Sequence, residues 1–223
     1  MSQLLLDIAP DWVPTLDNFI VGRNTELYAN LRNVLAASSG CIYIWGEAGS
    51  GKTHLLRAAV HRLSLQQRPA SYVADALSDD ALQRAEMIAV DDVDTLPEAA
   101  QITLFSLYNR IRENTGVLLV SGNAAPSHLS LRDDLRTRLG WGLVYQLHAL
   151  NDDEKALALH QHAHARGFIV SPEVMQYLLR HGRRDLPALL AVLDALDRHC
   201  LSLKRTASVP LLKEVMERYL KAV

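Results

Sequence analysis

One stretch of eight residues restricts the possible folds of this chain more than any other. It reads Gly-Glu-Ala-Gly-Ser-Gly-Lys-Thr, from Gly46 to Thr53, and fits the pattern G-x-x-x-x-G-K-[ST] at each required position. The apolar run Cys41–Trp45 precedes it, and a helical pattern follows it as far as Leu65. A strand, a glycine-rich loop and a helix in this order predict an α/β fold that binds phosphate groups.

Each residue type in this loop has a chemical reason to be there. Glycines adopt backbone angles that other residues avoid, so the loop can wrap closely round phosphates while its N–H groups point at them. We expect the Lys52 side chain to reach the β- and γ-phosphates and the Thr53 hydroxyl to hold Mg²⁺. The alternative is a glycine-rich turn that contains a lysine by chance. Nucleotide contacts are expected from Gly46, Gly49, Ser50, Gly51, Lys52, Thr53 and His54.

Two further strand ends carry polar residues that could serve the same ligand. The apolar run Met87–Val90 ends in Asp91 and Asp92. An acid at such a position in phosphate-loop proteins commonly orders Mg²⁺, and we assign this role to Asp91. Asp92 is expected to polarise the attacking water or to sense the γ-phosphate. The run Val117–Val120 leads into Ser-Gly-Asn, whose last residue, Asn123, is our candidate for contacting the γ-phosphate or the water. The structural alternative at both places is a polar turn.

Short apolar runs alternate with helical patterns as far as Leu150. The spacing of Leu27, Leu31, Val34 and Leu35, for example, is that of a helix with one buried face. Strands that alternate with helices imply a parallel sheet covered on both faces. The predicted strands are Cys41–Trp45, Ser71–Ala74, Met87–Val90, Val117–Val120 and Leu143–Leu147, and the predicted helices are Thr25–Ala37, Thr53–Leu65 and Gln101–Arg112.

From Asn151 onward only helical patterns remain. Asn151 and Ser171 can each cap a helix, and Gly167 can end the first one. The predicted helices run from Asn151 to about Arg166, from Pro172 to Gly182, from Asp185 to Leu201 and from Val209 to Leu220. We therefore expect a flexible N-terminal peptide over residues 1–14, an α/β nucleotide-binding subdomain over residues 15–150 and a small all-α lid over residues 151–223.

Composition narrows the class of protein. The chain of 223 residues has 23 Lys plus Arg against 25 Asp plus Glu, a formal net charge of −2. It therefore lacks the basic excess of proteins that bind nucleic acid non-specifically. Cys41 and Cys200 are too few and too distant for a disulfide framework, and we expect reduced, mostly buried thiols. No apolar run is long enough to span a bilayer and no signal-peptide pattern is visible, so we expect a cytoplasmic protein without membrane contact.

Three histidines, His160, His162 and His164, lie close together in one predicted helix. Only His160 and His164 share a helix face, and no acid or cysteine stands at metal-ligand spacing. We therefore expect solvated side chains on a helix surface rather than a metal site.

Two arginines lie far from the loop in the sequence. Arg138 begins the segment Arg-Leu-Gly-Trp-Gly before the fifth predicted strand, and Arg184 lies in the predicted lid. A guanidinium is always charged and binds phosphate in a planar fork, so an arginine can stabilise charge on a transferred phosphoryl group in its own site or in a neighbour's. Spacing alone favours a solvated surface arginine at both positions.

The order of these features resembles the AAA+ domain of the bacterial replication initiator family, DnaA. The arginine followed by Gly-Trp-Gly is the part most specific to that family, and Thr15–Gly22 is similar to the segment that opens the domain beside the adenine. The resemblance implies a phosphate-loop AAA+ core with bound ADP or ATP and Mg²⁺. It places Ile20 and Val21 at the adenine and Arg184 on the phosphates, and it makes Arg138 a finger that acts in trans on a partner's ATP.

The N-terminal residues resemble a second known element. The hexapeptide from Gln3 to Ile8 is similar to the short peptide Q-x-x-L-x-[hydrophobic] that docks on the bacterial sliding clamp, the β subunit of DNA polymerase III. Such a peptide places Leu6 and Ile8 in an apolar groove while Gln3 fixes the register. The alternative is an ordinary apolar N-terminus. Clamp contacts are expected from Gln3, Leu4, Leu6 and Ile8.

A DnaA-type core behind a clamp peptide resembles the DnaA-related regulatory inactivators. The resemblance implies a protein at the nucleoid or replisome that rides on the DNA-loaded clamp, contacts DNA mainly through the clamp, and makes the initiator DnaA hydrolyse its ATP, which prevents re-initiation. Asn123 stands where the family more often has an acid, so we expect weak or no intrinsic ATPase activity. Head-to-tail docking through Arg138 would also allow a homo-oligomer.

Two other functions stay open, and the first of them shares the whole core. One is an AAA+ ATPase that acts as a helicase loader or as a single-stranded-DNA-dependent replication factor, for which a basic or helicase-binding N-terminal extension is expected. The other is a phosphate-loop kinase, for which an acceptor pocket and a lid rich in basic residues within the core are expected. The N-terminal hexapeptide and the helical lid favour the regulator.

Overall fold

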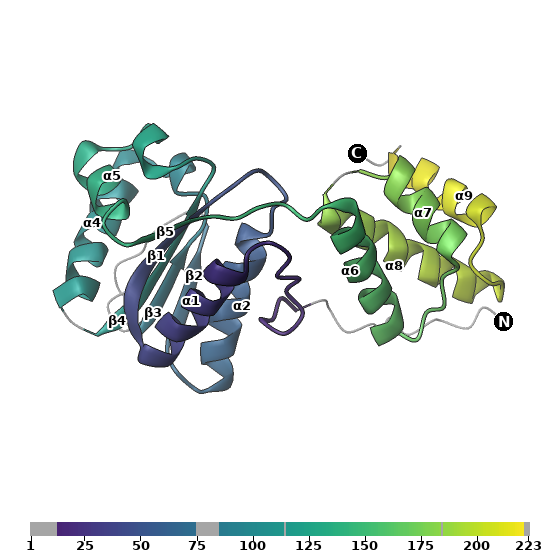
Figure 1. Cartoon of the computed structure of the whole chain (residues 1–223), viewed down its shortest axis with the longest axis horizontal. Coiled ribbons are helices and arrows are strands. Elements are labelled where there is room, and N and C mark those ends of the chain that lie inside the picture. Colours follow the sequence, from purple (N-terminus) through teal and green to yellow (C-terminus); the bar gives the residue numbers. More distant parts are fainter. Residues whose placement is uncertain (1–12, 75–84, 114, 184, 221–223) are drawn as a thin grey trace. The chain divides into compact units, whose positions relative to one another are not determined.

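The computed structural model describes residues 13–74, 85–113, 115–183 and 185–220 (Figure 1). These residues form two compact units. The first is an α/β unit made of the residues before Ile20 together with Glu26–Gly46 and Gly51–Leu147. The second contains Ile20–Thr25, Glu47–Ser50 and the helices that follow Leu147.

Five parallel strands form the sheet of the α/β unit, in the order β2-β3-β4-β1-β5. β1 (Ser39–Trp45) pairs with β4 (Gly116–Gly122) and β5 (Leu143–Gln146), and β3 (Met87–Val90) pairs with β4 and β2 (Ala70–Val73). β3 and β4 are buried along their whole length, as expected for strands covered on both faces. Because all strands run in one direction, their carboxyl ends meet at one edge of the sheet.

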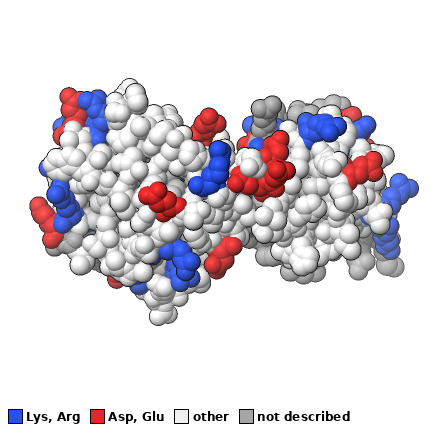
Figure 2. Space-filling model, in the orientation of Figure 1, with Lys and Arg blue, Asp and Glu red and all other residues white. Residues whose placement is uncertain are grey.

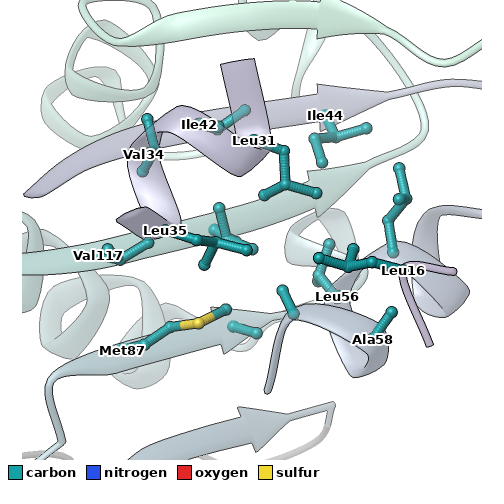
Figure 3. Close-up of a cluster of buried hydrophobic side chains, with 14 of the residues drawn as sticks. Leu16, Leu31, Val34, Leu35, Ile42, Ile44, Leu56, Ala58, Met87 and Val117 are labelled. Carbon is teal, nitrogen blue, oxygen red and sulfur yellow. The ribbon is translucent and has the colours of Figure 1, made fainter. Parts of the chain in front are cut away.

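One face of the sheet is covered by helices α1 (Thr25–Ala37) and α2 (Lys52–Leu65). α1 buries the four apolar residues whose spacing predicted it. Their partners are alternate residues of β1, β3 and β4, which point to the same side because side chains alternate along a strand. Figure 3 shows this cluster, whose labelled members include Leu31, Leu35, Ile42, Ile44, Leu56, Met87 and Val117.

The opposite face is covered by helices α4 (Glu98–Glu113) and α5 (Asp133–Leu139). The intervening strand residues point to this side, and two short 3-10 turns, η1 (Val93–Thr95) and η2 (Pro126–His128), connect the strands to these helices. The buried strand residues of this second cluster are Tyr43, Ile88, Val90, Leu118 and Val120.

The predicted elements of the α/β unit are present, with differences at their ends. β3 has the predicted bounds, whereas β1 begins at Ser39 rather than Cys41 and α4 at Glu98 rather than Gln101. β4 continues through Gly122, beyond its predicted end at Val120. Helix α5 was not predicted, because a helix of seven residues is too short for a hydrophobic period to stand out.

The second unit contains helices α6 (Asp152–Ala165), α7 (Pro172–His181), α8 (Leu186–Leu203) and α9 (Val209–Leu220), as the helical patterns predict. Their apolar stripes meet in one cluster. The largest buried side chains of that cluster are Leu159, Met175, Leu178, Leu189, Leu193, Leu196, Leu211, Leu212 and Met216.

Polar caps begin these helices where the sequence placed them. The Asn151 side chain accepts the N–H of Glu154 at 2.9 Å, and the Glu154 carboxylate accepts the N–H of Asn151 at 2.7 Å, which forms a capping box. Ser171 accepts the N–H of Val174 at 3.4 Å. These bonds satisfy N–H groups that the first turn of a helix leaves without a partner.

One histidine of α6 contradicts the expectation of three solvated side chains. His160 and His164 are exposed, but His162 is only 2% exposed, and its Nε2 lies 2.6 Å from Asp194 Oδ1 on α8. Arg166 Nε lies 3.4 Å from the same oxygen. The prediction was wrong for His162, because a helical period does not reveal a carboxylate that another helix supplies.

Both cysteines are free thiols, as the sequence predicts. Burial raises the pKa of the Cys41 thiol to about 11, so it stays protonated at neutral pH. No described helix combines the length and the apolar character that crossing a membrane requires.

Candidate functional site

Three strand ends bring the candidate residues to one edge of the sheet. β1, β3 and β4 are parallel neighbours, so the phosphate loop after β1, the acids after β3 and Asn123 after β4 leave the sheet side by side. The Gly46 N–H donates to the Gly122 carbonyl at 3.3 Å and ties the start of the loop to the end of β4. Ligands of open α/β sheets bind beyond the carboxyl ends of the strands, which is where these residues lie.

The loop has the backbone that its glycines predict. The φ angles of Gly49 and Gly51 are +76° and +106°, in the region that side chains rarely adopt. A Cβ on Gly51 would also lie 3.3 Å from Cε2 of Phe19. The Lys52 ammonium donates to the Gly46 carbonyl at 2.8 Å, across the loop. Because α2 begins at Lys52, the end of the helix whose dipole favours an anion lies in this loop.

One buried hydroxyl group in this loop, that of Ser50, has a hydrogen-bonding capacity that a ligand could satisfy. Ser50 is 6% exposed, and its Oγ has no hydrogen-bond partner among the described residues. Leaving a buried polar atom unpaired costs about 1–3 kcal/mol, so such atoms normally have a partner. A phosphate oxygen would accept the Ser50 hydroxyl, and the start of α2 favours negative charge nearby. The residues present therefore fit a phosphate group.

Asp91 is a buried carboxylate with two hydroxyl donors. It is 2% exposed; the Tyr72 hydroxyl donates to Oδ2 at 2.7 Å, and the Ser121 hydroxyl donates to Oδ1. Ser121 Oγ in turn accepts the N–H of Asp92 at 2.9 Å. Sequence reasoning missed Tyr72 and Ser121, because their contacts depend on the order of β2, β3 and β4. The only available signal was that Ser121 precedes Asn123 in the same polar strand end.

Asp92 is the exposed carboxylate of the pair. Its φ of +47° is unusual for a residue other than glycine and marks local strain of the kind that collects in functional sites. Although the residue is exposed, partial burial of its carboxyl group and the charge of Asp91 raise the pKa of Asp92, whereas the Lys52 ammonium opposes this shift. The strand end thus presents a carboxylate that interacts with the loop lysine.

Asn123 follows β4 directly. Its backbone N–H donates to Asp94 Oδ1 at 2.9 Å, and the Tyr43 hydroxyl donates to the Ala124 carbonyl at 2.6 Å, so the backbone at this point is held on both sides. The side chain of Asn123 is exposed and makes no hydrogen bond to a described residue. It is therefore available to a ligand.

The metal prediction concerns an ion that would arrive with the nucleotide. Within the described ranges, no three His, Cys, Asp or Glu side chains gather into a site of their own. Mg²⁺ in nucleotide sites uses only one or two carboxylates together with phosphates and waters. The donor set, with the exposed Thr53 hydroxyl and the Asp91–Asp92 strand end, fits such an ion better than a metal held by protein alone.

The segment predicted to lie at the adenine is anchored within the second unit. Ile20 and Val21 are half-buried and belong to the same compact unit as the loop tip Glu47–Ser50. The Asn24 side-chain amide donates to the His148 carbonyl at 3.0 Å and accepts the His148 N–H at 2.8 Å. This pair of bonds fixes the path of the segment.

His54 makes contacts inside the α/β unit. Its Nε2 lies 3.1 Å from the Thr15 carbonyl oxygen, and its ring lies 5.6 Å from that of Phe19. Burial lowers the pKa of His54, against the effect of the Thr15 contact, so the neutral ring is favoured. The predicted nucleotide contact of His54 stays a prediction.

Arg138 lies in an exposed aromatic setting in the last turn of α5. Its Cζ lies 4.1 Å from the ring centroid of Trp141 and 5.7 Å from that of Phe105. The Cζ of Arg112, on α4, lies 5.1 Å from the same Trp141 ring, which is 56% exposed. Among the described residues, neither arginine forms an ion pair. We call Phe105, Arg112, Arg138 and Trp141 the arginine patch.

Five predicted site residues lie outside the described part of the chain. They are Gln3, Leu4, Leu6, Ile8 and Arg184. Their roles on the clamp and on the phosphates therefore stay predictions.

Comparison with known proteins decides the family. The model of the bacterial DnaA ATPase domain matches residues 13–80 and 74–146, and the model described as the Hda lid domain matches residues 152–216. This chain belongs to the DnaA-related AAA+ family. Its lid is of the Hda type, which agrees with the resemblance found in the sequence.

One relative in sequence and two solved structures are similar to most of this chain. An uncharacterised protein of Haemophilus influenzae is 36% identical over 96% of this chain and 98% of its own length. Domain III of the Thermotoga maritima replication initiation protein DnaA superposes with a TM-score of 0.81 at 18% identity, covering 93% of this chain and 97% of that one. AMPPCP-bound DnaA from Aquifex aeolicus gives a TM-score of 0.71 at 21% identity, over 82% and 66% of the two chains. This DnaA-related chain therefore has the AAA+ fold that the sequence predicts.

Proposed function

We propose that this DnaA-related protein regulates the initiation of replication by making the initiator DnaA hydrolyse its bound ATP. In this proposal the chain binds ADP or ATP at the phosphate loop, docks on the sliding clamp through its N-terminal peptide, and presents Arg138 to the ATP of DnaA. The observation that carries the proposal is the arginine patch: the Arg138 guanidinium is held on an exposed ring, with no acidic partner among the described residues.

Nucleotide binding is supported by the loop. The unpaired Ser50 hydroxyl, the left-handed glycines and the start of α2 together suit a phosphate chain. The adenine nucleotide is inferred from the family rather than from the loop, which by itself recognises only phosphates. Mg²⁺ would be held by Thr53 and the Asp91–Asp92 strand end, and when bound it would neutralise part of the phosphate charge.

The same site is poorly equipped to hydrolyse its own nucleotide. Each oxygen of Asp91 accepts one hydrogen bond, from Tyr72 or Ser121, so this carboxylate serves the sheet edge as well as Mg²⁺. Asn123 cannot accept a proton as an acid's carboxylate would. In this proposal the bound nucleotide stabilises the conformation of the chain and is hydrolysed slowly or not at all.

The energetic reason for a partner to use Arg138 is large. A guanidinium at the developing charge of a transferred phosphoryl group is worth about 10³- to 10⁵-fold in rate in comparable systems. That factor corresponds to about 4–7 kcal/mol of transition-state stabilisation. Arg138 is planar, permanently charged and accessible. It could therefore supply a cation that the ATP site of DnaA lacks.

The clamp peptide would supply proximity. A short peptide docked on the clamp converts the encounter with an initiator on the same DNA into a local one, which raises the effective concentration without a strong direct contact. Direct DNA contact is not needed. On the face shown in Figure 2, acidic and basic side chains are interspersed, which agrees with a chain that reaches DNA through a partner.

The test is the rate of ATP hydrolysis by purified DnaA in the presence of DNA-loaded clamp, with and without this protein. We expect stimulation by the wild-type chain, and loss of stimulation with Arg138→Ala and with Gln3→Ala. Arg62→Ala, which removes an exposed arginine of α2, is the matched control and should stimulate fully.

Two outcomes would contradict the proposal. Full stimulation by Arg138→Ala would remove the finger from Arg138. ATP turnover by this chain alone, increased by single-stranded DNA and indifferent to the initiator, would instead favour a helicase loader or another single-stranded-DNA-dependent ATPase.

A further inference from the structure

Trp141 is shared by two guanidinium groups. Arg138 approaches its ring to 4.1 Å from α5, and Arg112 approaches the same ring to 5.1 Å from α4. The ring is more than half exposed, so hydrophobic burial does not account for its position. A cation over the face of an exposed tryptophan gains about 0.5–1 kcal/mol, and more when water is excluded.

The backbone beneath Trp141 is fixed on both sides. The Trp141 N–H donates to the Arg138 carbonyl at 3.1 Å, which closes the end of α5. The next residue, Gly142, lies so close to β1 that a Cβ on it would be 2.8 Å from the Cys41 carbonyl oxygen. The indole therefore stands on a rigid base, whereas an arginine side chain alone has many rotamers to lose.

The two acids at the start of α5 are paired with other arginines. Asp133 Oδ1 lies 2.7 Å from Arg136, and Asp134 Oδ2 lies 3.0 Å from Arg132. The two guanidiniums on Trp141 are therefore like charges held near each other without a described counter-ion. Their mutual repulsion is small at a solvent-exposed surface, but both charges add to the attraction for an anionic group that approaches the ring.

We propose that Trp141 is a positioning residue for Arg138, and that Arg112 is a second cation directed at the same anionic group, the triphosphate of a nucleotide bound by a partner. This inference rests on the proposed function, because that function supplies the triphosphate. Trp141 touches no reacting atom. It limits the orientations of the Arg138 guanidinium, and Arg112 adds positive charge beside it.

The charged patch is tested first on the free protein with Trp12→Phe and Trp45→Phe, so that Trp141 is the one remaining tryptophan of the sequence. Iodide and acrylamide both quench exposed tryptophan fluorescence, but only iodide is concentrated by neighbouring cations. We expect Arg112→Gln and Arg138→Gln each to reduce quenching by iodide while quenching by acrylamide stays unchanged. Arg62→Gln serves as the distant control. Unchanged iodide quenching in both patch variants would overturn the shared arrangement, whether or not the chain acts on an initiator.

Positioning is tested by the maximal stimulated rate of DnaA ATP hydrolysis, measured separately from the half-saturating concentration of this protein. We expect Trp141→Leu to lower the maximal rate by roughly 10- to 100-fold, because small misplacements of a catalytic group have effects of that order. The half-saturating concentration should change little. Trp141→Phe, which keeps an aromatic face, should restore most of the rate. Arg112→Gln should lower the rate, with partial rescue in Arg112→Lys.

The double variant separates positioning from docking. If Trp141 acts through Arg138, Trp141→Leu has a much smaller effect in an Arg138→Lys background, which keeps a cation and a measurable rate but lacks the planar guanidinium. An equal loss in both backgrounds, or a change confined to the half-saturating concentration, would show that Trp141 is only a docking contact. Full activity of Arg138→Gln itself is a different result: it would contradict the finger and hence the proposed function.

Discussion

The Tyr72 hydroxyl donates a hydrogen bond of 2.7 Å to Asp91, across neighbouring strands β2 and β3. Together with Ser121 it occupies both oxygens of a carboxylate that is almost fully buried. The two adjacent acids at this strand end therefore differ in character. Asp91 is part of a hydrogen-bonded network inside the sheet edge, and Asp92 is exposed beside the loop lysine.

Removal of the Ser121 hydroxyl should destabilise this edge. In Ser121→Ala the Asp92 N–H loses its acceptor and Asp91 loses one donor, at a fully buried position. We expect a loss of about 1–3 kcal/mol in the free energy of unfolding, measured by urea denaturation. Ser106→Ala, on the exposed side of α4, is the control and should cost under about 0.5 kcal/mol. Equal losses for the two variants would contradict the role given to Ser121.

The raised pKa of Asp92 predicts a pH-dependent gain in stability when its charge is removed. A carboxyl whose pKa is raised in the folded state contributes stability below its ordinary pKa of 3.8, and that contribution is lost as the pH rises through the folded-state value. At neutral pH the ionised Asp92 therefore opposes folding. Asp92→Asn should raise the free energy of unfolding near pH 7, and this gain should shrink near pH 4.

Any gain that persists at both pH values would come from the backbone and should be small, because aspartate and asparagine both tolerate the positive φ at this position. Urea denaturation of the nucleotide-free protein at the two pH values separates the two contributions. A gain that does not depend on pH would mean that only the backbone effect is real.

Gly51 should not tolerate a side chain. Its φ of +106° is unfavourable for alanine, and a Cβ would press against Phe19 at 3.3 Å. We expect Gly51→Ala to destabilise the chain by about 1–2 kcal/mol and to weaken nucleotide binding. Gly140→Ala is the matched control, because Gly140 has a helical backbone with φ of −77° and its nearest Cβ contact would be 3.5 Å. Similar effects of the two substitutions would contradict this reading of the loop.

His162 should stabilise the packing of α6 on α8. In His162→Ala, Asp194 keeps Arg166 at 3.4 Å but loses its buried imidazole partner. We expect faster amide hydrogen exchange in both helices, equivalent to about 1–3 kcal/mol of lost protection. His160→Ala, exposed on the same helix, should leave exchange almost unchanged. The expectation fails if the two variants exchange alike.

Much of this fold could be predicted because its signals are local. The buried run Met87–Val90 has the predicted bounds, and α1 buries the four residues whose spacing indicated it. Asn151 and Ser171 cap the helices that they were expected to cap. These features follow from side-chain period and backbone hydrogen bonding within a few residues.

The features that escaped prediction are those that require distant segments to meet. Ser121 contacts Asp91 because β3 and β4 are neighbours, and Tyr72 does so because β2 lies on the other side of β3. His162 is buried because α8 supplies Asp194. The stacking of Arg112 and Arg138 on Trp141 likewise joins α4 to the end of α5. Such contacts depend on which strands and helices are neighbours in the fold. The spacing of residues along the sequence does not reveal this.

The most direct measurement is a calorimetric titration of the folded protein with ADP and with ATP in the presence of Mg²⁺. We predict one nucleotide per chain, and for Lys52→Ala a loss of affinity of roughly 10-fold or more, since a charged hydrogen bond to phosphate is worth about 1.5–3 kcal/mol. Binding of neither nucleotide by well-folded wild-type protein would contradict the phosphate site on which the regulatory function is built.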